Sequence, residues 1–397
     1  MISTPRPAGW TPRAAADVGP GRIAAFLPPA LPVTPLPATW EKHMPKKHRT
    51  AQTRREFLRA TTTAGVITAM GPAILAAESK SGSRPLTVGC GAHTYEVQHN
   101  WGRLPDHLRW GDTHGVVFDE EGLVYITHQS TAAAPMDAVV VFDPQGNYLR
   151  SFGKEFHGGG HGLDIRREGG EQFLYLCDIK NRRVAKLSLR GELAWSRDYP
   201  KESGVYRAAK QYRPTNVAFA PDGGFYVGDG YGSHYIHQYD KNAQWVRTWG
   251  GAGSAAGKLR TPHGLCFDDR PGRTPALVVA DRGNSRLQYF TPDGKHLGFV
   301  ANLPNPCHFS IRGTDLLVPD LHSRVTILDG ANQVIVHLGD DPQWTARVLK
   351  ESLRGKPDKW QPGKFVHPHQ ARFDRDGNIF VVEWVPIGRV TKLRRLA

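Results

Sequence analysis

Two consecutive stretches of the chain, beginning at Pro214 and Pro262, follow the same pattern. Each contains a polar residue, a short apolar run, a turn, a second apolar run that ends in Asp, a loop rich in Gly, Asn or Ser, and two further apolar runs. Short runs of β-forming residues bounded by turn residues indicate strands. Four such strands in a unit of roughly 47 residues are typical of one propeller blade, so the doublet predicts an all-β propeller.

The pattern recurs along the chain and predicts a six-bladed β-propeller. The inner strands are expected to start at His114, His161, Asn216, His263, His308 and His369. The sixth repeat has only three strands before the chain ends, so its outer strand has to come from elsewhere. We expect the N-terminal residues 94–101 to pair beside residues 389–396, which would close the ring without an open sheet edge. Residues 199–213 and 340–366 are predicted to be insertions, as loops or a short helix over one mouth.

The first 80 residues differ from the repeats, and the propeller is expected to occupy residues 81–397. Pro and Ala dominate residues 1–43, a composition that cannot build a packed core, so this part is predicted to be a disordered leader. Met44 begins a segment of conventional signal length and is an alternative start.

Arg54 and Arg55, followed by Phe-Leu and by a mildly apolar run rich in Thr, Gly and Ala, resemble a twin-arginine export signal. An ordinary amphipathic helix is the alternative interpretation. The resemblance implies a signal peptide, recognition by the twin-arginine export machinery, a periplasmic or extracellular protein, and no stable membrane span after processing.

Charge and cysteine content narrow the class of function. The first 80 residues carry 11 Lys and Arg against 4 Asp and Glu, so half of the formal net charge of +14 lies there. The rest of the chain has a weak positive balance and no Lys/Arg run, which argues against a nucleic-acid partner. The cysteines have no CxxC spacing, and buried thiols are favoured over one bridged pair; they are Cys90, Cys177, Cys266 and Cys307.

A loop motif, Asp-x-x-Asn-x-Arg, occurs twice in the repeats, at Asp178/Asn181/Arg183 and at Asp281/Asn284/Arg286. With this motif, residues 90–397 resemble the NHL-repeat family of six-bladed propellers. The resemblance implies the fold but says little about chemistry, because propellers serve as binding proteins and as enzymes.

Histidine occupies five of the six predicted strand starts. Antiparallel order within a blade brings the start of the first strand and the loop after the second strand to one face of the ring. Blades two, four and six alternate around the ring, so His161, His263 and His369 would form a near-trigonal set with an open position. Such a set suits zinc or another divalent transition metal. The alternative is that each histidine is a hydrogen-bonded residue at a strand start.

Four further polar residues are candidates for contacts with the metal ligands or with a substrate. His114, Asn216 and His308 occupy the remaining strand starts, and His128 follows the second strand of blade one. His114 and His308 are also candidates for a different metal arrangement.

Within the NHL group, the chain is most similar to peptidyl-alpha-hydroxyglycine alpha-amidating lyases. The segments HGLDI, TPHGL and HPHQARF match the places where these enzymes hold zinc, at His161, His263 and His369. The resemblance implies that Tyr231, in DGYGSHYIHQY, is the catalytic tyrosine and that Arg282, in VADRGNSRLQ, is an active-site arginine. Both residues fall in loops on the predicted histidine face.

Other interpretations of these two residues, and two departures from the lyase pattern, remain. Tyr231 could pack in its Gly-rich turn, and Arg282 could pair with a neighbouring aspartate. A second active-site arginine, expected near His128, is absent. The acidic residue expected after the last zinc histidine is Gln370, which puts a structural calcium in doubt.

These features predict an exported, metal-dependent enzyme of lyase type that acts on a small molecule or peptide. By resemblance, it would cleave a C–N bond and release an amide and glyoxylate. The alternative is a non-catalytic periplasmic propeller that binds a peptide, sugar or protein at its mouth, through histidines and through aromatic residues such as Trp110, Tyr231, Trp344 and Trp384. A calcium-dependent hydrolase is disfavoured, because the strand starts lack acidic residues.

Overall fold

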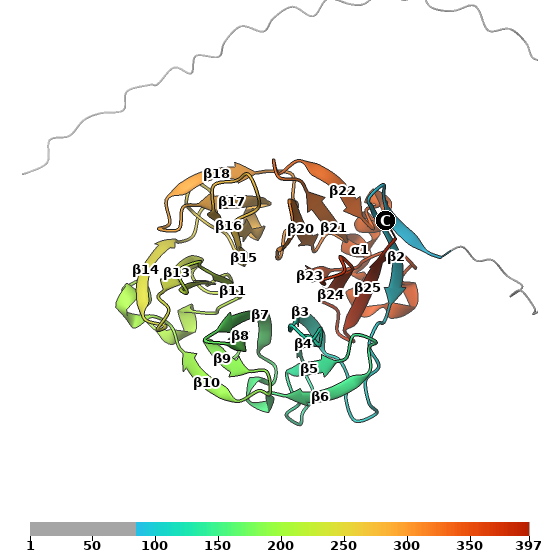
Figure 1. The fold of residues 1–397 in the computed structure, drawn as a ribbon, viewed down its shortest axis with the longest axis horizontal. Coiled ribbons are helices and arrows are strands. Elements are labelled where there is room, and N and C mark those ends of the chain that lie inside the picture. The colour runs from blue at the N-terminus through green and yellow to red at the C-terminus, as the bar shows by residue number, and fades with distance from the viewer. Residues whose placement is uncertain (1–84, 397) are drawn as a thin grey trace, which may run out of the picture. The chain divides into compact units, whose positions relative to one another are not determined.

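The computed structural model describes residues 85–396, and Figure 1 shows them as six antiparallel sheets arranged around a central axis. The six-bladed, all-β propeller predicted from the repeats is therefore confirmed. The leader, with Arg54 and Arg55, lies outside the described residues. Within residues 85–396, no helix has the length and apolar character needed to cross a membrane.

The first strand of each blade lies nearest the axis: β3 (Asp112–Phe118), β7 (Gly160–Glu168), β11 (Asn216–Phe219), β15 (Pro262–Asp268), β19 (Ser310–Arg312) and β23 (Pro368–Phe373). The second strands are β4 (Val124–Gln129), β8 (Glu171–Asp178), β12 (Phe225–Gly228), β16 (Ala276–Asp281), β20 (Asp315–Asp320) and β24 (Ile379–Glu383). The third strands are β5 (Val139–Phe142), β9 (Arg183–Ser188), β13 (Tyr235–Tyr239), β17 (Arg286–Phe290), β21 (Arg324–Leu328) and β25 (Arg389–Arg395). The outer strands of blades one to five are β6 (Tyr148–Phe152), β10 (Leu193–Arg197), β14 (Trp245–Gly250), β18 (His296–Val300) and β22 (Val334–Leu338).

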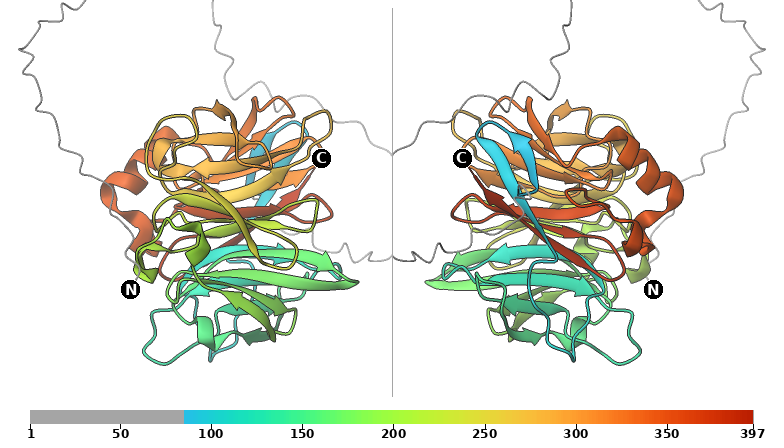
Figure 2. Two further views of the ribbon diagram at one scale, coloured as in Figure 1. Left: turned by 90° about the vertical axis from the view of Figure 1, so that its left-hand side faces the viewer. Right: turned by 90° about the vertical axis from the view of Figure 1, so that its right-hand side faces the viewer.

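The sixth blade is closed by the N-terminal part of the propeller, as predicted. Strand β2 (His93–His99) pairs antiparallel with β25, so that Tyr95 lies opposite Arg395. A further strand, β1 (Thr87–Cys90), pairs with β2 and makes this sheet five-stranded, which the repeat pattern did not predict. Figure 2 shows this N-terminal hairpin, in blue, beside the red C-terminal blade. Closure in this way leaves the ring without a seam between its first and last blades.

The two predicted insertions lie on one face of the ring, as Figure 2 shows. Residues 199–213 contain the short 3-10 turns η2 (Lys201–Ser203) and η3 (Ala209–Gln211). Residues 340–366 contain the helix α1 (Pro342–Glu351) and the turns η5 (Leu353–Gly355) and η6 (Pro357–Lys359). Both insertions contact loops that follow the second strand of a blade, through Tyr206 to Asp229 and through Thr345 to His322.

The helix α1 begins where the sequence supplies a cap. The carboxylate of Asp341 accepts hydrogen bonds from the main-chain amides of Gln343 and Trp344, and Pro342 occupies the first helical position. Trp344 is 2% exposed, and its indole N–H donates to the main-chain oxygen of Phe365. Trp344 is therefore a core residue of the insertion, and the expectation that it contacts a ligand at the mouth is wrong.

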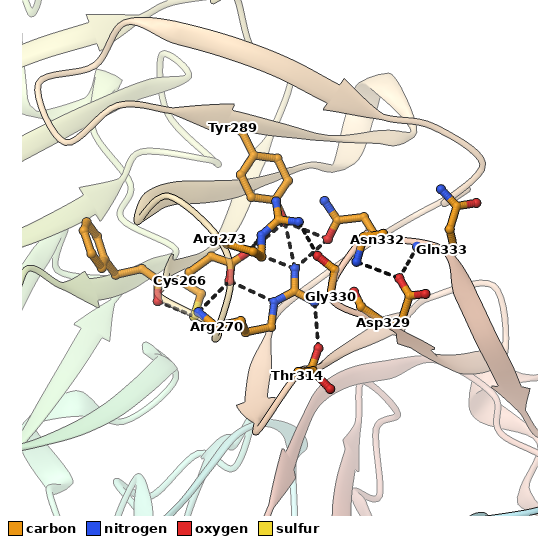
Figure 3. A network of polar contacts seen from close by, with 12 residues as sticks. Cys266, Arg270, Arg273, Tyr289, Thr314, Asp329, Gly330, Asn332 and Gln333 are labelled. Atoms are coloured by element: carbon orange, nitrogen blue, oxygen red, sulfur yellow. Dashed lines mark hydrogen bonds and ion pairs between the residues drawn. The ribbon is translucent and has the colours of Figure 1, made fainter.

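Buried arginines join neighbouring blades. Figure 3 shows Arg270, which is 1% exposed, between blades four and five. Its Nε and Nη2 donate to the carboxylate of Asp268 at 2.8 Å each, and its Nη1 donates to the main-chain oxygens of Thr314 at 3.2 Å and Asp329 at 2.8 Å. This buried arginine therefore ties blade four to blade five.

Candidate metal centre

The inner strands of blades one, two, four and six each contain a β-bulge at a histidine. Their register against the second strand shifts at His114, His161, His263 and His369. Bulges re-aim a side chain and are frequent beside functional sites. Strand β11 of blade three carries Asn216 and pairs without a shift, and β19 of blade five begins two residues after His308. Blade three thus differs in backbone geometry from blades one, two, four and six, although its sequence follows the same repeat.

The four bulged histidines form one cluster on the axis, which we call the histidine cluster. The structure brings the predicted trio together, with ring centroids 5.0 Å apart for His161 and His263, 4.8 Å for His161 and His369, and 4.6 Å for His263 and His369. The ring of His114 lies 4.4 Å from that of His369 and 4.6 Å from that of His161. All four side chains are buried. Within residues 85–396, the ligand nitrogens that lie within 4.8 Å of one another belong to His114, His161 and His369.

Three of these rings are oriented by carbonyl groups of the adjacent blade. Nδ1 of His161 donates to Thr215 O at 2.7 Å, Nδ1 of His263 to Cys307 O at 2.8 Å, and Nδ1 of His369 to His114 O at 2.8 Å. A carbonyl oxygen only accepts hydrogen bonds, so each Nδ1 carries the proton and each Nε2 has a free lone pair. Metal-binding histidines are commonly held by this kind of hydrogen bond.

The glycine that follows His161 or His263 lets these carbonyls approach. A Cβ atom at Gly162 would lie 2.3 Å from Thr215 O, and one at Gly264 would lie 2.3 Å from Cys307 O. Real Cβ contacts are essentially never so short. The His-Gly pairs of the sequence therefore have a physical reason: the oxygen that orients the imidazole occupies the space of the next side chain.

The imidazoles of the histidine cluster are neutral at pH 7. Burial lowers the pKa of His161 to about 3 and places the pKa values of His114, His263 and His369 well below the usual range. Neighbouring histidines lower the pKa of His114 and His369 further, and Arg282 does so for His263. Neutral imidazole is the form that binds a metal.

The histidine cluster has more imidazole nitrogen lone pairs than N–H and O–H groups that could donate hydrogen bonds to them. The hydroxyl of Tyr231 lies 3.0 Å from Nε2 of His263 and 3.3 Å from Nε2 of His161, and it can donate to only one of them. Nδ1 of His114 faces Nε2 of His369 at 3.2 Å and donates to it. Nε2 of His114 has no hydrogen-bond partner among the described residues. Unsatisfied buried acceptors cost about 1–3 kcal/mol each, so this donor set fits a cation.

Tyr231 and Arg282 lie beside the cluster, on the loops where the sequence predicted them. The guanidinium carbon of Arg282 is 5.3 Å from the centroid of the Tyr231 ring. Burial raises the pKa of Tyr231, against the effect of Arg282, so the phenol is protonated at pH 7 in the metal-free protein. Tyr231 does not simply pack in its turn, because its hydroxyl contacts two imidazoles of the cluster.

Arg282 has no acidic partner within residues 85–396. Its Nη1 is 3.7 Å from Sγ of Cys307, and it forms no ion pair. The Asp281 carboxylate instead binds Asn284 and Arg286, as the repeated loop motif predicts. Asp229 accepts hydrogen bonds from the Tyr206 hydroxyl and from main-chain amides. A largely buried guanidinium without a carboxylate is suited to bind an anionic group of a ligand.

The remaining predicted contacts lie outside the histidine cluster. His128 packs its ring 5.2 Å from that of Trp110, and its Nδ1 accepts from the main-chain amide of Gly111 at 3.0 Å. Nδ1 of His308 faces the Phe309 carbonyl oxygen, and the Asn216 side chain accepts from the Val217 amide at 2.9 Å. Each of the three is thus engaged with nearby main chain.

Gln370 joins blade six to blade one. Its side-chain oxygen accepts from Val116 N at 3.2 Å, and its side-chain nitrogen donates to Val116 O at 3.3 Å. A carboxylate side chain at position 370 would have no N–H group to donate to Val116 O. The four cysteines, which are all described, are free thiols.

Comparisons with known proteins point to two groups. The chain is 33% identical over 161 residues to peptidyl-glycine alpha-amidating monooxygenase A of Xenopus laevis, an alignment that covers 38% of this chain and 16% of the relative. It is 25% identical over 342 residues to peptidyl-alpha-hydroxyglycine alpha-amidating lyase 1 of Drosophila melanogaster, which covers 74% of this chain and 59% of the relative. It is also 27% identical over 249 residues to human NHL repeat-containing protein 3, with coverages of 59% and 69%. The chain thus spans less than a fifth of the frog monooxygenase, and no family model matches it.

Solved structures with low sequence identity have the same fold. A streptogramin B lyase superposes with a TM-score of 0.50 at 14% identity, over 76% of this chain and 97% of that protein. A protein of unknown function from Bacteroides thetaiotaomicron superposes with a TM-score of 0.53 at 13% identity, over 75% of both chains. The comparisons therefore support an NHL-repeat six-bladed propeller with homology to peptidylglycine-amidating enzymes and to NHL proteins.

Proposed function

We propose that the protein is a metal-dependent lyase that cleaves a C–N bond next to a hydroxyl-bearing carbon. The observation that carries the proposal is the set of three Nε2 lone pairs, on His161, His263 and His369, which carbonyl hydrogen bonds fix in place. Zinc or another divalent transition metal bound there would polarise a substrate oxygen and favour the ionised form of a nearby phenol.

Tyr231 is the proposed acid–base group. In its ionised form it takes the proton of the substrate hydroxyl; the oxygen then forms a carbonyl and the C–N bond breaks. The nitrogen leaves as an amide after the Tyr231 hydroxyl returns the proton, so atoms and charges balance. Arg282, which has no carboxylate partner in the part of the chain that the structure describes, would hold the carboxylate of a peptidyl-α-hydroxyglycine substrate. The products would be a peptide amide and glyoxylate.

Metal analysis and a turnover assay on the same sample test this proposal. We expect about one equivalent of a transition metal in protein purified without chelators, and release of glyoxylate from a peptidyl-α-hydroxyglycine. Less than about 0.2 equivalents would contradict the metal centre, because preformed histidine sites hold transition metals tightly. Full metal content without glyoxylate release would contradict the lyase activity and leave a metal-binding propeller.

A further inference from the structure

We infer that His114 is a fourth metal ligand, so that this site presents four imidazole nitrogens instead of three. The inference rests on the metal centre proposed above. Its first support is geometric: Nδ1 of His114 lies 3.2 Å from Nε2 of His369. Two nitrogens that bind one metal at about 2.0–2.1 Å lie roughly 3–3.4 Å apart. The two rings already have the separation of neighbouring ligands.

The second support is the backbone. His114, His161, His263 and His369 each lie at a register shift between the first and second strands of their blade, whereas Asn216 of blade three lies in regular pairing. A bulge removes a residue from regular pairing and directs its side chain elsewhere. The register shift at His114 thus matches those at the three predicted ligands.

The third support is the proton on His114. Carbonyl oxygens fix the proton on Nδ1 in the other three rings, but Nε2 of His114 is buried and has no partner among the described residues. Among the described residues, only the Nε2 lone pair of His369 holds the His114 proton on Nδ1. When a cation takes the lone pair of His369, the N–H of His114 loses its acceptor and would point at the cation. Moving this proton to Nε2 frees Nδ1 to bind.

Four imidazole ligands would change the coordination number of the metal and therefore the metals that the site prefers. Three histidines and one substrate oxygen give the four-coordinate arrangement that zinc favours, whereas four histidines and a substrate oxygen require at least five positions. Imidazole ligands also suit iron, nickel and copper, so we expect the protein to accept metals that tolerate higher coordination numbers.

Spectroscopy of the full-length chain, stripped of metal and reloaded, tests the inference. Cu(II)-loaded protein should show electron paramagnetic resonance splitting from four nitrogens, and Co(II)-loaded protein should show the weak visible bands of five or six ligands. His114→Ala should reduce the nitrogen count by one and give the intense bands of four-coordinate cobalt, or should lose cobalt while remaining folded. His296→Ala is the matched control, because Nε2 of His296 is also buried without a partner among the described residues but belongs to the outer strand β18, away from the histidine cluster. It should leave both spectra unchanged.

Three outcomes would overturn the inference. A three-nitrogen pattern in the unmodified protein excludes His114 as a ligand, whether or not the variant folds. Identical spectra for His114→Ala and the unmodified protein exclude it as well, and so does an equal change in His296→Ala. In each of these cases the three-histidine centre remains. Failure of the unmodified protein to bind any metal would instead remove the metal centre itself.

Discussion

The hydroxyl of Tyr231 lies 3.0 Å from Nε2 of His263, on the side of the imidazole opposite to its carbonyl acceptor. Replacing Tyr231 by Phe removes the only atom of this side chain that can move a proton, but it removes no imidazole. We expect kcat to fall by about 10²–10⁴-fold, the usual contribution of a general acid or base, with metal content unchanged. Steady-state kinetics and metal analysis of one preparation check this, and unchanged kcat would exclude Tyr231 from proton transfer.

Arg282 should set the preference for an anionic substrate. Arg282→Met preserves much of the side-chain volume and removes the charge. We expect kcat/KM for a carboxylate substrate to fall roughly 10–100-fold, since hydrogen bonds to charged groups contribute about 1.5–3 kcal/mol. A substrate whose carboxylate is replaced by a carboxamide is the control, because it should be cleaved equally by both proteins. Equal losses with both substrates would show that Arg282 acts in some other way.

The glycines beside the histidines should be intolerant of a methyl group. In Gly162→Ala, the new Cβ would meet Thr215 O at 2.3 Å and displace the acceptor that orients His161. We expect a loss of about 1–3 kcal/mol in the free energy of unfolding and weaker metal binding. Gly298→Ala is the matched control in a strand, because nothing lies within 4 Å of its Cβ position. Denaturant unfolding and metal titration would detect the difference, and equal behaviour of the two variants would contradict it.

Acid should destabilise the propeller through buried neutral histidines outside the metal centre. Burial lowers the pKa of His237 to about 3, and its ring nitrogens face Tyr206 and Thr248. An unfolded histidine titrates near 6.5, so the unfolded state binds more protons below that pH, and stability is lost as the pH falls from about 6.5 toward 3. Between pH 7.5 and pH 5 this one group should account for about 2 kcal/mol.

The variant His237→Gln isolates that contribution. Its free energy of unfolding, measured in urea, should fall less between pH 7.5 and pH 5 than that of the unmodified protein. Equal pH dependence in both proteins would show that His237 is not held neutral.

The predicted twin-arginine export signal can be tested by substitutions in the N-terminal leader. Arg54→Lys combined with Arg55→Lys keeps the charge and removes the arginine pair that resembles the twin-arginine signal. We expect the double variant to remain in the cytoplasm of a bacterial host while the unmodified chain is exported. Cell fractionation followed by immunoblotting measures the distribution, and continued export of the double variant would contradict the signal.

Much of the fold could be predicted because its information is local. The turn residues and apolar runs of Pro214 to Phe290 indicate the strands of a blade, and the incomplete sixth repeat requires an outer strand from the N-terminal side. The loop motif at Asp281 also contains Asn284 and Arg286, the two side chains that bind that carboxylate in the structure. The short strand β1 was missed, since it pairs with a strand that is itself outside the repeats.

The sequence by itself determined the blade count and the closure of the ring. Those properties follow from strand alternation and turn chemistry, which are encoded in neighbouring residues. Only the tertiary structure decided which histidines meet: bulges bring His114 into the cluster with the predicted trio, while His128 and His308 contact nearby main chain. Ring orientation depends on carbonyl groups of the adjacent blade, such as Thr215 O and Cys307 O. Those contacts join residues 44 and 54 positions apart, and no local pattern specifies them.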